Sequence, residues 1–169
     1  MLEAKVDQFN LVMRPHDFDL LDSAEWSALA EKMIQSFIEN TRIDQLFGQL
    51  SESDSFRPAG YNVVYNFNGL PAHAIAFSVK QADKGLLVST NAHFWNMWQK
   101  RYFEKFNERL ELFKLFKMIQ NPKIYTAHFS RVDLAIDFID EGIDVGALYR
   151  SIMDGRSEVY YDHKTKKTG

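Results

Sequence analysis

The sequence predicts an α+β fold, an antiparallel sheet with two longer helices packed on one face. Short alternating runs between residues 61 and 90, separated by turn signals, are typical of antiparallel strands. Apolar residues recur at helical spacing in 23–40 and again in 93–119. The run 125–137 alternates apolar and charged side chains, as a strand with one buried face does.

Length and composition indicate one globular domain over residues 1–169. Hydrophobic residues make up 46% of the chain, enough for a core. The chain has no cysteine, which excludes disulfides, thiol nucleophiles and cysteine zinc sites. No apolar run approaches the ~18 residues of a membrane helix, and the N-terminus lacks the apolar region of a signal peptide. We therefore expect a cytoplasmic protein with no membrane partner.

Charge is unevenly distributed along the chain. The net charge is −3, but residues 1–60 hold 11 acidic and 5 basic side chains, whereas residues 61–169 hold 12 acidic and 15 basic ones. A protein that coats nucleic acid without specificity would be far more positive. A local basic surface remains compatible with this composition.

The first third of the chain reads as strand, loop and helix. Residues 5–13 are rich in strand-forming types, and Pro15 lies in a polar loop. Asp22 or Ser23 is expected to cap a helix that ends near Asn40, followed by a short helical turn before Gly48. Residues 49–60 are expected to form a surface loop.

The middle of the chain predicts three strands and one long helix. The strands are expected at 61–67, 74–79 and 86–90, with an Asn68–Gly69 turn after the first. Thr90 or Asn91 is expected to cap a helix over 93–119. Like charges lie one turn apart on its polar face, and a bound anion would relieve their repulsion. The basic residues predicted to contact nucleic acid there are Lys100, Arg101 and Lys105.

The strand 125–137 is the element around which the prediction is organised. One of its faces is expected to be buried under the 93–119 helix and carries Val132, Leu134, Ile136 and Phe138. The other face carries Arg131, Asp133, Ala135 and Asp137. Two carboxylates and a guanidinium on one face suit a divalent cation with a phosphate beside it. An ordinary solvated strand face is the alternative.

Geometry restricts how the two carboxylates can act together. Residues four apart on a strand lie ~13 Å apart at Cα, whereas metal–oxygen bonds measure ~2.0–2.6 Å. Asp133 and Asp137 would share one ion only on a strongly twisted or bulged strand. A plain surface pair between Arg131 and Asp133 is the alternative for Asp133.

A short helix and one further strand are expected at the end of the chain. Asp144 is predicted to cap the helix and Gly155 to end it. Its inward side chains are expected to be Val145, Leu148, Tyr149 and Ile152. Residues 157–161 read as a strand. The chain has no glycine-rich phosphate loop and no paired-histidine metal motif.

The run Ser130–Asp137, S-R-V-D-L-A-I-D, resembles the motif strand of the replication initiation factor family. This family comprises rolling-circle initiators of plasmids and phages and related relaxases of conjugative elements. The early strand with Asp7 and Phe9 and the order of strands, long helix, motif strand and short helix add to the likeness. The resemblance implies that residues 1–169 form the N-terminal portion of a larger nicking domain.

The resemblance also implies an activity and a set of site residues. The family's enzymes are metal-dependent single-strand DNA nickases in which a tyrosine forms a 5′-phosphotyrosine. Asp133 and Asp137 would bind Mg²⁺ or Mn²⁺, and Arg131, with the three basic residues of the long helix, would contact DNA at an origin or nick site.

Two further points stay open at this stage. The family's nucleophilic tyrosine is expected on a strand beyond Gly169, so this chain alone is not expected to nick DNA. The alternative is a non-catalytic DNA- or protein-binding module of a mobile genetic element. A homodimer is compatible with either.

Overall fold

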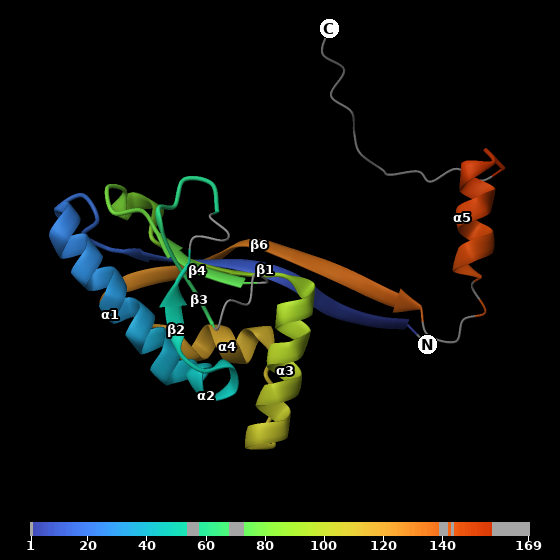
Figure 1. The fold of residues 1–169 in the computed structure, drawn as a ribbon, viewed down its shortest axis with the longest axis horizontal. Helices are drawn as coiled ribbons and strands as arrows, with labels where there is room; N and C mark the ends of the chain where they lie inside the picture. Colours follow the sequence, from blue (N-terminus) through green and yellow to red (C-terminus); the bar gives the residue numbers. More distant parts are fainter. Residues whose placement is uncertain (1, 54–57, 68–72, 139–141, 143, 157–169) are drawn as a thin grey trace, which may run out of the picture. The chain divides into compact units, whose positions relative to one another are not determined.

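The computed structural model describes residues 2–53, 58–67, 73–138, 142 and 144–156 (Figure 1). The chain divides into two compact units. The larger unit is Lys5–Ala135, and the smaller unit combines Met1–Ala4 with Ile136–Gly169. The predicted Asn68–Gly69 turn and the predicted strand 157–161 lie outside the described residues.

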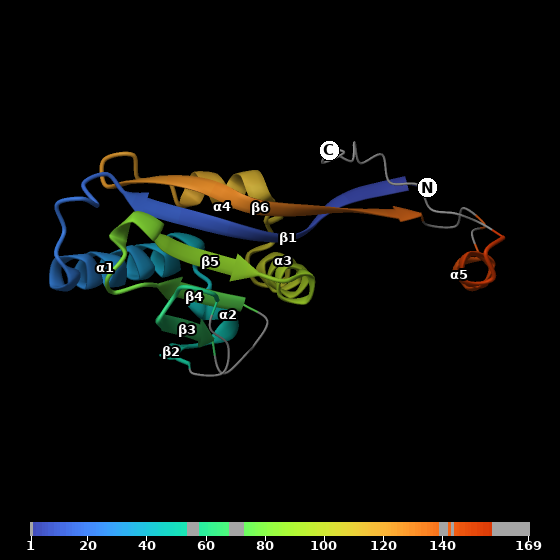
Figure 2. The same ribbon diagram turned by 90° about the horizontal axis from the view of Figure 1, so that it is seen from above.

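A six-stranded antiparallel sheet forms the framework, in the order β2-β3-β4-β5-β1-β6 (Figure 2). β1 pairs with β5, with Phe9 opposite Thr90. Within the described residues, all the predicted strands are present. β2 falls in the predicted loop 49–60, because three residues are too few to show an alternating pattern. The strand bounds are Leu2–Pro15 (β1), Leu50–Glu52 (β2), Val63–Phe67 (β3), His73–Phe77 (β4), Leu86–Thr90 (β5) and Tyr125–Phe138 (β6).

Local side-chain caps set the starts of the two longer helices. Asp22 Oδ1 accepts hydrogen bonds from the backbone N–H groups of Ala24 and Glu25, both at 2.8 Å, and Glu25 Oε2 accepts from the Asp22 N–H at 3.1 Å. Asn91 Oδ1 accepts from the Phe94 N–H at 2.8 Å. Of the two candidates predicted for each helix, Asp22 rather than Ser23 and Asn91 rather than Thr90 provide the caps. The helices of the larger unit are α1 (Ser23–Thr41), α2 (Asp44–Phe47), α3 (Ala92–Phe106) and α4 (Leu112–Met118).

The predicted single helix over 93–119 is wrong, because α3 and α4 are separate. α3 ends at Asn107, which adopts a left-handed backbone conformation with φ 53°. Asparagine tolerates this conformation better than most residues do. Leu110 then turns inward to 2% exposure, and its carbonyl accepts a hydrogen bond from Gln99 Nε2 at 2.9 Å. The apolar spacing therefore continues across the break although the helix does not.

The helices of the larger unit cover one face of the sheet, as predicted (Figures 1 and 2). The core between them is aromatic. The Phe9 ring lies 5.1 Å from Trp95, which in turn lies 5.8 Å from Trp98. Trp26 is buried, and its indole N–H donates to the Ser78 carbonyl at 2.9 Å. The contacts of Trp95 with Phe9 and Trp98 are edge-to-face, and ring contacts of this kind add stability beyond the burial of apolar area.

The predicted burial of the apolar stripe on β6 is wrong. Val132, Leu134 and Ile136 are 39%, 75% and 62% exposed, and the side chain of Phe138 lies outside the described residues. The opposite set of side chains faces the core near the start of β6. Tyr125 is buried there, and the centroid of the Phe129 ring lies 5.2 Å from that of Phe116. Alternation sorts side chains into two sets, but it does not say which set faces the helices.

The smaller unit contains α5, Val145–Met153. The Asp144 carboxylate caps its start by accepting from the Ala147 N–H at 2.8 Å, and Gly155 follows its end with φ 67°. Both ends were predicted. The prediction that Leu148 and Tyr149 point inward is wrong, since they are 48% and 63% exposed. An apolar helix face becomes buried only where another surface covers it.

Candidate nucleic-acid interface

Arg131 and Asp133 form a two-pronged ion pair on β6. Arg131 Nε donates to Asp133 Oδ1 at 2.8 Å, and Arg131 Nη2 donates to Oδ2 at 2.5 Å. The two side chains are 56% and 35% exposed. Parallel bonds of this kind are among the strongest hydrogen bonds in proteins, and they fix the planes of both groups. Two of the predicted site residues are therefore joined directly.

Gln8 of β1 completes this cluster. Its Nε2 donates to Asp133 Oδ2 at 2.7 Å, across 125 residues of sequence. The bonds from Arg131, with a smaller contribution from Gln8, hold the pKa of the Asp133 carboxyl below its usual value, although partial desolvation opposes them. The sequence carries no signal for Gln8, because its role depends on how β1 and β6 align. The Gln8–Arg131–Asp133 set is called the β6 cluster below.

The β6 cluster does not fit a divalent cation as it stands. The Asp133 carboxylate already accepts three hydrogen bonds, and the adjacent guanidinium would repel a metal ion. In the part of the chain that the structure describes, no three histidine, aspartate or glutamate side chains gather to hold a metal. Asp137 belongs to the smaller unit and is half-buried. Metal binding by Asp133 and Asp137 stays a prediction.

Two of the three predicted basic residues of α3, Arg101 and Lys105, contact α2, and together with Lys100 they are called the α3 basic cluster. Arg101 Nη1 donates to the Leu46 carbonyl at 2.8 Å, and Lys105 Nζ donates to the Gln45 carbonyl at 2.9 Å. These carbonyls lie in the last turn of α2, where cations are favourable. The repulsion between Arg101 and Lys105 is thus offset within the protein itself, without an anion.

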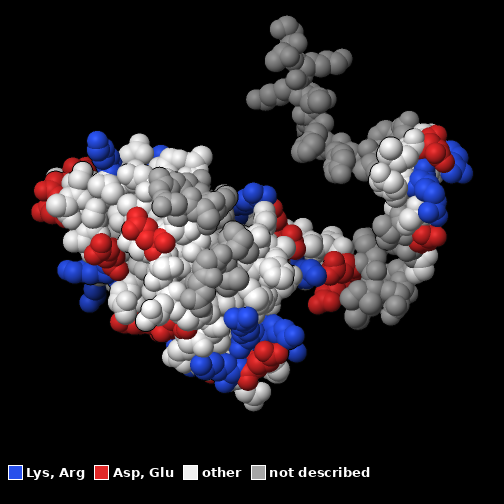
Figure 3. Space-filling model, viewed as in Figure 1, with Lys and Arg blue, Asp and Glu red and all other residues white. Residues whose placement is uncertain are grey.

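The α3 basic cluster borders an open hollow of about 320 Å³, lined by Gln45, Leu46, Arg101, Glu104 and Lys105. Lys100 lies 3.9 Å from Glu104, and both side chains are well exposed. Figure 3 shows the basic side chains over α3 with acidic ones among them. Arg101 and Lys105 use only part of their hydrogen-bonding capacity on α2, so they retain N–H groups for a phosphate.

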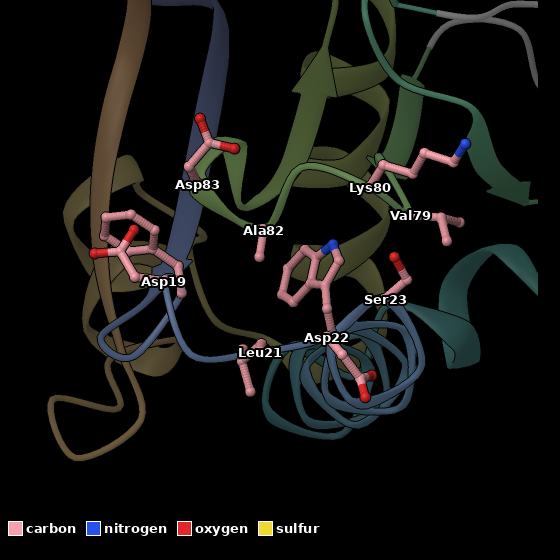
Figure 4. A pocket seen from close by; sticks show the side chains of 10 residues that line it. Asp19, Leu21, Asp22, Ser23, Val79, Lys80, Ala82 and Asp83 are labelled. Atoms are coloured by element: carbon pink, nitrogen blue, oxygen red, sulfur yellow. The ribbon is translucent and has the colours of Figure 1, made fainter.

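A second hollow, of about 200 Å³, lies where α1 begins, with the segment 79–83 on its opposite side (Figure 4). Its lining holds Asp19, Asp22 and Asp83 against Lys80. Asp22 is also the N-cap of α1. A hollow bordered by three carboxylates and one ammonium repels phosphate. Of these two hollows, the one beside α3 is suited to nucleic acid.

These features define an α+β domain whose antiparallel sheet is covered on one face, with a basic cluster on α3 and an ion pair on an edge strand. A similar fold occurs in the rolling circle replication initiator protein from Geobacillus stearothermophilus, with a TM-score of 0.52 and 14% sequence identity. The similarity covers 96% of this chain and 54% of that chain, so this chain spans about half the length of the initiator.

At this level of identity the likeness shows a shared fold. The chain matches no protein-family model and no curated protein. Among the described residues, no helix is both long and apolar enough to span a membrane.

Proposed function

We propose that this chain is part of a rolling-circle DNA replication initiator of the replication initiation factor family, acting on DNA in the cytoplasm. The observation that carries the proposal is the fold shared with a replication initiator over 96% of the chain. The S-R-V-D-L-A-I-D strand supports it independently of the fold, because its resemblance to the family's motif strand lies in the residues themselves. The proposed DNA is an origin or nick site.

The α3 basic cluster is the proposed contact to the phosphate backbone. Lys100 is exposed and lies 3.9 Å from Glu104, whereas Arg101 and Lys105 are held against α2. Held cations lose less side-chain entropy when they bind a phosphate. Arg131 would add a further contact, since a guanidinium has five N–H donors and the bond to Asp133 uses two of them.

Nicking is the finer part of the proposal and rests on the family resemblance. In that scheme a divalent metal at Asp133 and Asp137 would polarise the scissile phosphate. What the β6 cluster does in this chain is to keep the Asp133 carboxylate ionised and oriented beside Arg131. The same hydrogen bonds favour the second candidate, a DNA-binding module without catalysis, because they compete with a metal for Asp133.

DNA binding is tested by fluorescence anisotropy with labelled single-stranded and hairpin DNA over a range of salt concentrations. The combined Lys100→Ala, Arg101→Ala and Lys105→Ala variant is expected to bind more weakly, with the salt slope reduced by about 0.7 for each lost phosphate contact to a single strand. The matched control replaces three exposed lysines elsewhere, Lys32, Lys80 and Lys123, with alanine. Equal loss in both variants would show that binding does not depend on the α3 basic cluster.

Nicking is tested separately with supercoiled plasmid and Mn²⁺. A protein–DNA adduct that survives denaturing electrophoresis supports the nickase. DNA binding without nicked plasmid or adduct agrees with both candidates, because this chain alone is not expected to nick DNA. Absence of binding to both the single-stranded and the hairpin DNA, at every salt concentration, would contradict the proposed function.

A further inference from the structure

Two adjoining hollows lie at the end of the larger unit where β1 ends and α1 begins. The first is the hollow of about 200 Å³ in Figure 4, beside the start of α1. The second, of about 230 Å³, is lined by Pro15, Asp17, Leu21, Leu29, Lys123 and Ile124. Leu21 lines both, so the two hollows meet at this side chain. The two together are called the α1 hollows below.

The walls of the α1 hollows are largely apolar. Trp26 and Ala82 line the first hollow beside Leu21. Leu29 and Ile124 line the second, and Ile124 is 42% exposed. A cavity of ~150 Å³ holds a benzene molecule. Each hollow therefore has room for one leucine or phenylalanine side chain.

Charged groups form the rim of these apolar walls. In Figure 4 the charged ends of Lys80 and Asp83 point away from Leu21 and Ala82. An apolar side chain can therefore enter the first hollow without displacing them. Carboxylates outnumber ammonium groups around the two hollows, with Asp17, Asp19, Asp22 and Asp83 against Lys80 and Lys123.

Most of these carboxylates are available to a partner. Within the described part of the chain, no side chain bonds to the carboxylates of Asp17, Asp19 or Asp83. The Arg14 guanidinium lies over the Phe18 ring, 5.3 Å from its centroid, rather than against an acid. The rim of the α1 hollows therefore attracts cations, whereas it repels the phosphates for which the α3 basic cluster is suited.

These features together define the chemistry of the partner. Two apolar hollows on either side of a leucine accept two apolar anchors, and an acidic rim accepts basic side chains beside those anchors. Nucleic acid carries neither feature. A peptide segment in which apolar residues alternate with lysine or arginine carries both.

We propose that the α1 hollows are a docking site for a basic peptide segment of a protein partner, with two apolar side chains as anchors. One anchor packs against Trp26 and the other against Leu29. Basic side chains next to the anchors pair with Asp19 and Asp83 on the rim. This proposal does not depend on DNA binding or nicking, because it uses none of the residues proposed for either.

The first test is NMR titration of the protein with a synthetic peptide in which two leucines are flanked by lysines. The chain has three tryptophans, and the indole N–H of Trp26 beside the first hollow donates to the Ser78 carbonyl. The Trp26 indole resonance is expected to shift, while those of Trp95 and Trp98, in the core, stay in place. Peptides with glutamate for lysine, or serine for leucine, are expected to cause no shift. An unchanged Trp26 resonance, or equal shifts with either control peptide, would overturn the proposal.

The second test measures affinity for the same peptide, labelled with fluorescein, by anisotropy. The combined Asp19→Asn and Asp83→Asn variant is expected to bind about 2- to 30-fold more weakly, because it loses two exposed charge pairs. The matched control, Glu31→Gln with Glu111→Gln, removes two exposed acids outside the hollows and is expected to bind as wild type does. Equal affinities of these two variants would overturn the proposal.

The third test addresses the apolar wall. Leu21→Ser is expected to bind the peptide more than tenfold more weakly, whereas Phe113→Ser, at an exposed position of α4, is expected to bind as wild type does. Circular dichroism confirms that both variants fold. The combined alanine variant of the α3 basic cluster is expected to bind the peptide normally, so failure of DNA binding and failure of peptide docking are distinguishable. Loss of peptide binding in that variant instead would place the peptide on α3 and overturn the proposal.

Discussion

Arg42 donates a hydrogen bond from its guanidinium to the Tyr102 hydroxyl at 2.6 Å, which joins the end of α1 to α3. The same guanidinium lies 3.9 Å from the centroid of the Phe106 ring. Arg42 holds these contacts from a left-handed backbone conformation, φ 55°, at the C-cap of α1. An arginine in this conformation carries backbone strain that a glycine does not. The side-chain contacts offset that strain.

Substitutions at Arg42 separate the contacts from the strain. Arg42→Ala should lower the free energy of unfolding by about 2–3 kcal/mol, because it loses a charged hydrogen bond and a cation–π contact but keeps the strained backbone. Arg42→Gly loses the same contacts but relieves about 1 kcal/mol of strain, so it should be less destabilised. Urea denaturation measures both. A glycine variant no more stable than the alanine variant would contradict this account.

A matched pair of leucines tests the orientation of β6. Leu115 is fully buried, so Leu115→Ala should cost about 2–5 kcal/mol of unfolding free energy. Leu134 is 75% exposed, so Leu134→Ala should change it by less than about 0.5 kcal/mol when measured at low protein concentration. Denaturant titration measures the unfolding free energy of both variants. A large cost at Leu134 would mean that the apolar stripe of β6 is buried after all.

The β6 cluster predicts a pH dependence of stability. The pKa of Asp133 is lowered in the folded protein, chiefly by its bond from Arg131, relative to the usual aspartate value of 3.8. A lowered pKa contributes stability that is fully present above that value and is lost as the pH falls through the folded-state pKa. Wild type should therefore be more stable than Asp133→Asn at neutral pH, and the difference should shrink below pH 3.8. Denaturant titrations across pH test this, and a constant difference would contradict it.

Lys100 and Arg101 should differ in what they contribute. Arg101 bonds to the Leu46 carbonyl at the end of α2, so Arg101→Ala should lower the unfolding free energy by up to about 1 kcal/mol and also weaken DNA binding. Lys100 pairs only loosely with Glu104, so Lys100→Ala should weaken DNA binding with little change in stability. Thermal denaturation and anisotropy on the same samples separate the effects. Equal stability losses would show that the contact with Leu46 contributes little.

The proposed metal is tested by NMR titration with Mn²⁺. If Asp133 and Asp137 are metal ligands, resonances of residues 131–137 broaden in wild type and less so in Asp133→Ala and Asp137→Ala. Arg131→Ala should bind Mn²⁺ more tightly than wild type, because it removes the cation that occupies the Asp133 carboxylate. If the resonances do not broaden, or if both aspartate variants bind as wild type does, the aspartates are not metal ligands.

Local features of this protein could be predicted from the sequence. Each helix cap was narrowed to two adjacent candidates, one of which is the observed cap, Asp22 or Asn91, because capping hydrogen bonds reach only two or three residues along the chain. The three strands between residues 61 and 90 followed from alternation and turn residues, and the single-sided core followed from the helical spacing of large apolar residues. Such signals are complete within a short segment.

Tertiary structure alone decided which face of β6 meets the helices. Alternation groups Val132 with Leu134 and Arg131 with Asp133, but both assignments satisfy the pattern equally, and the packing of Tyr125 and Phe129 selects one of them. The break after Asn107 could not be predicted, because Leu110 is buried and continues the apolar spacing although it lies outside the helix.

The candidate site shows the same division. Its charged residues could be recognised from sequence, because residue type and spacing are local. The pair between Arg131 and Asp133 was among the alternatives, because the two residues are close in sequence. Partners from distant segments could not be recognised. Asp133 depends on Gln8 across 125 residues, and Arg101 and Lys105 depend on carbonyls of α2. These contacts form only when the strands align and the helices pack, since hydrogen bonds between distant segments depend on the three-dimensional register of the whole core.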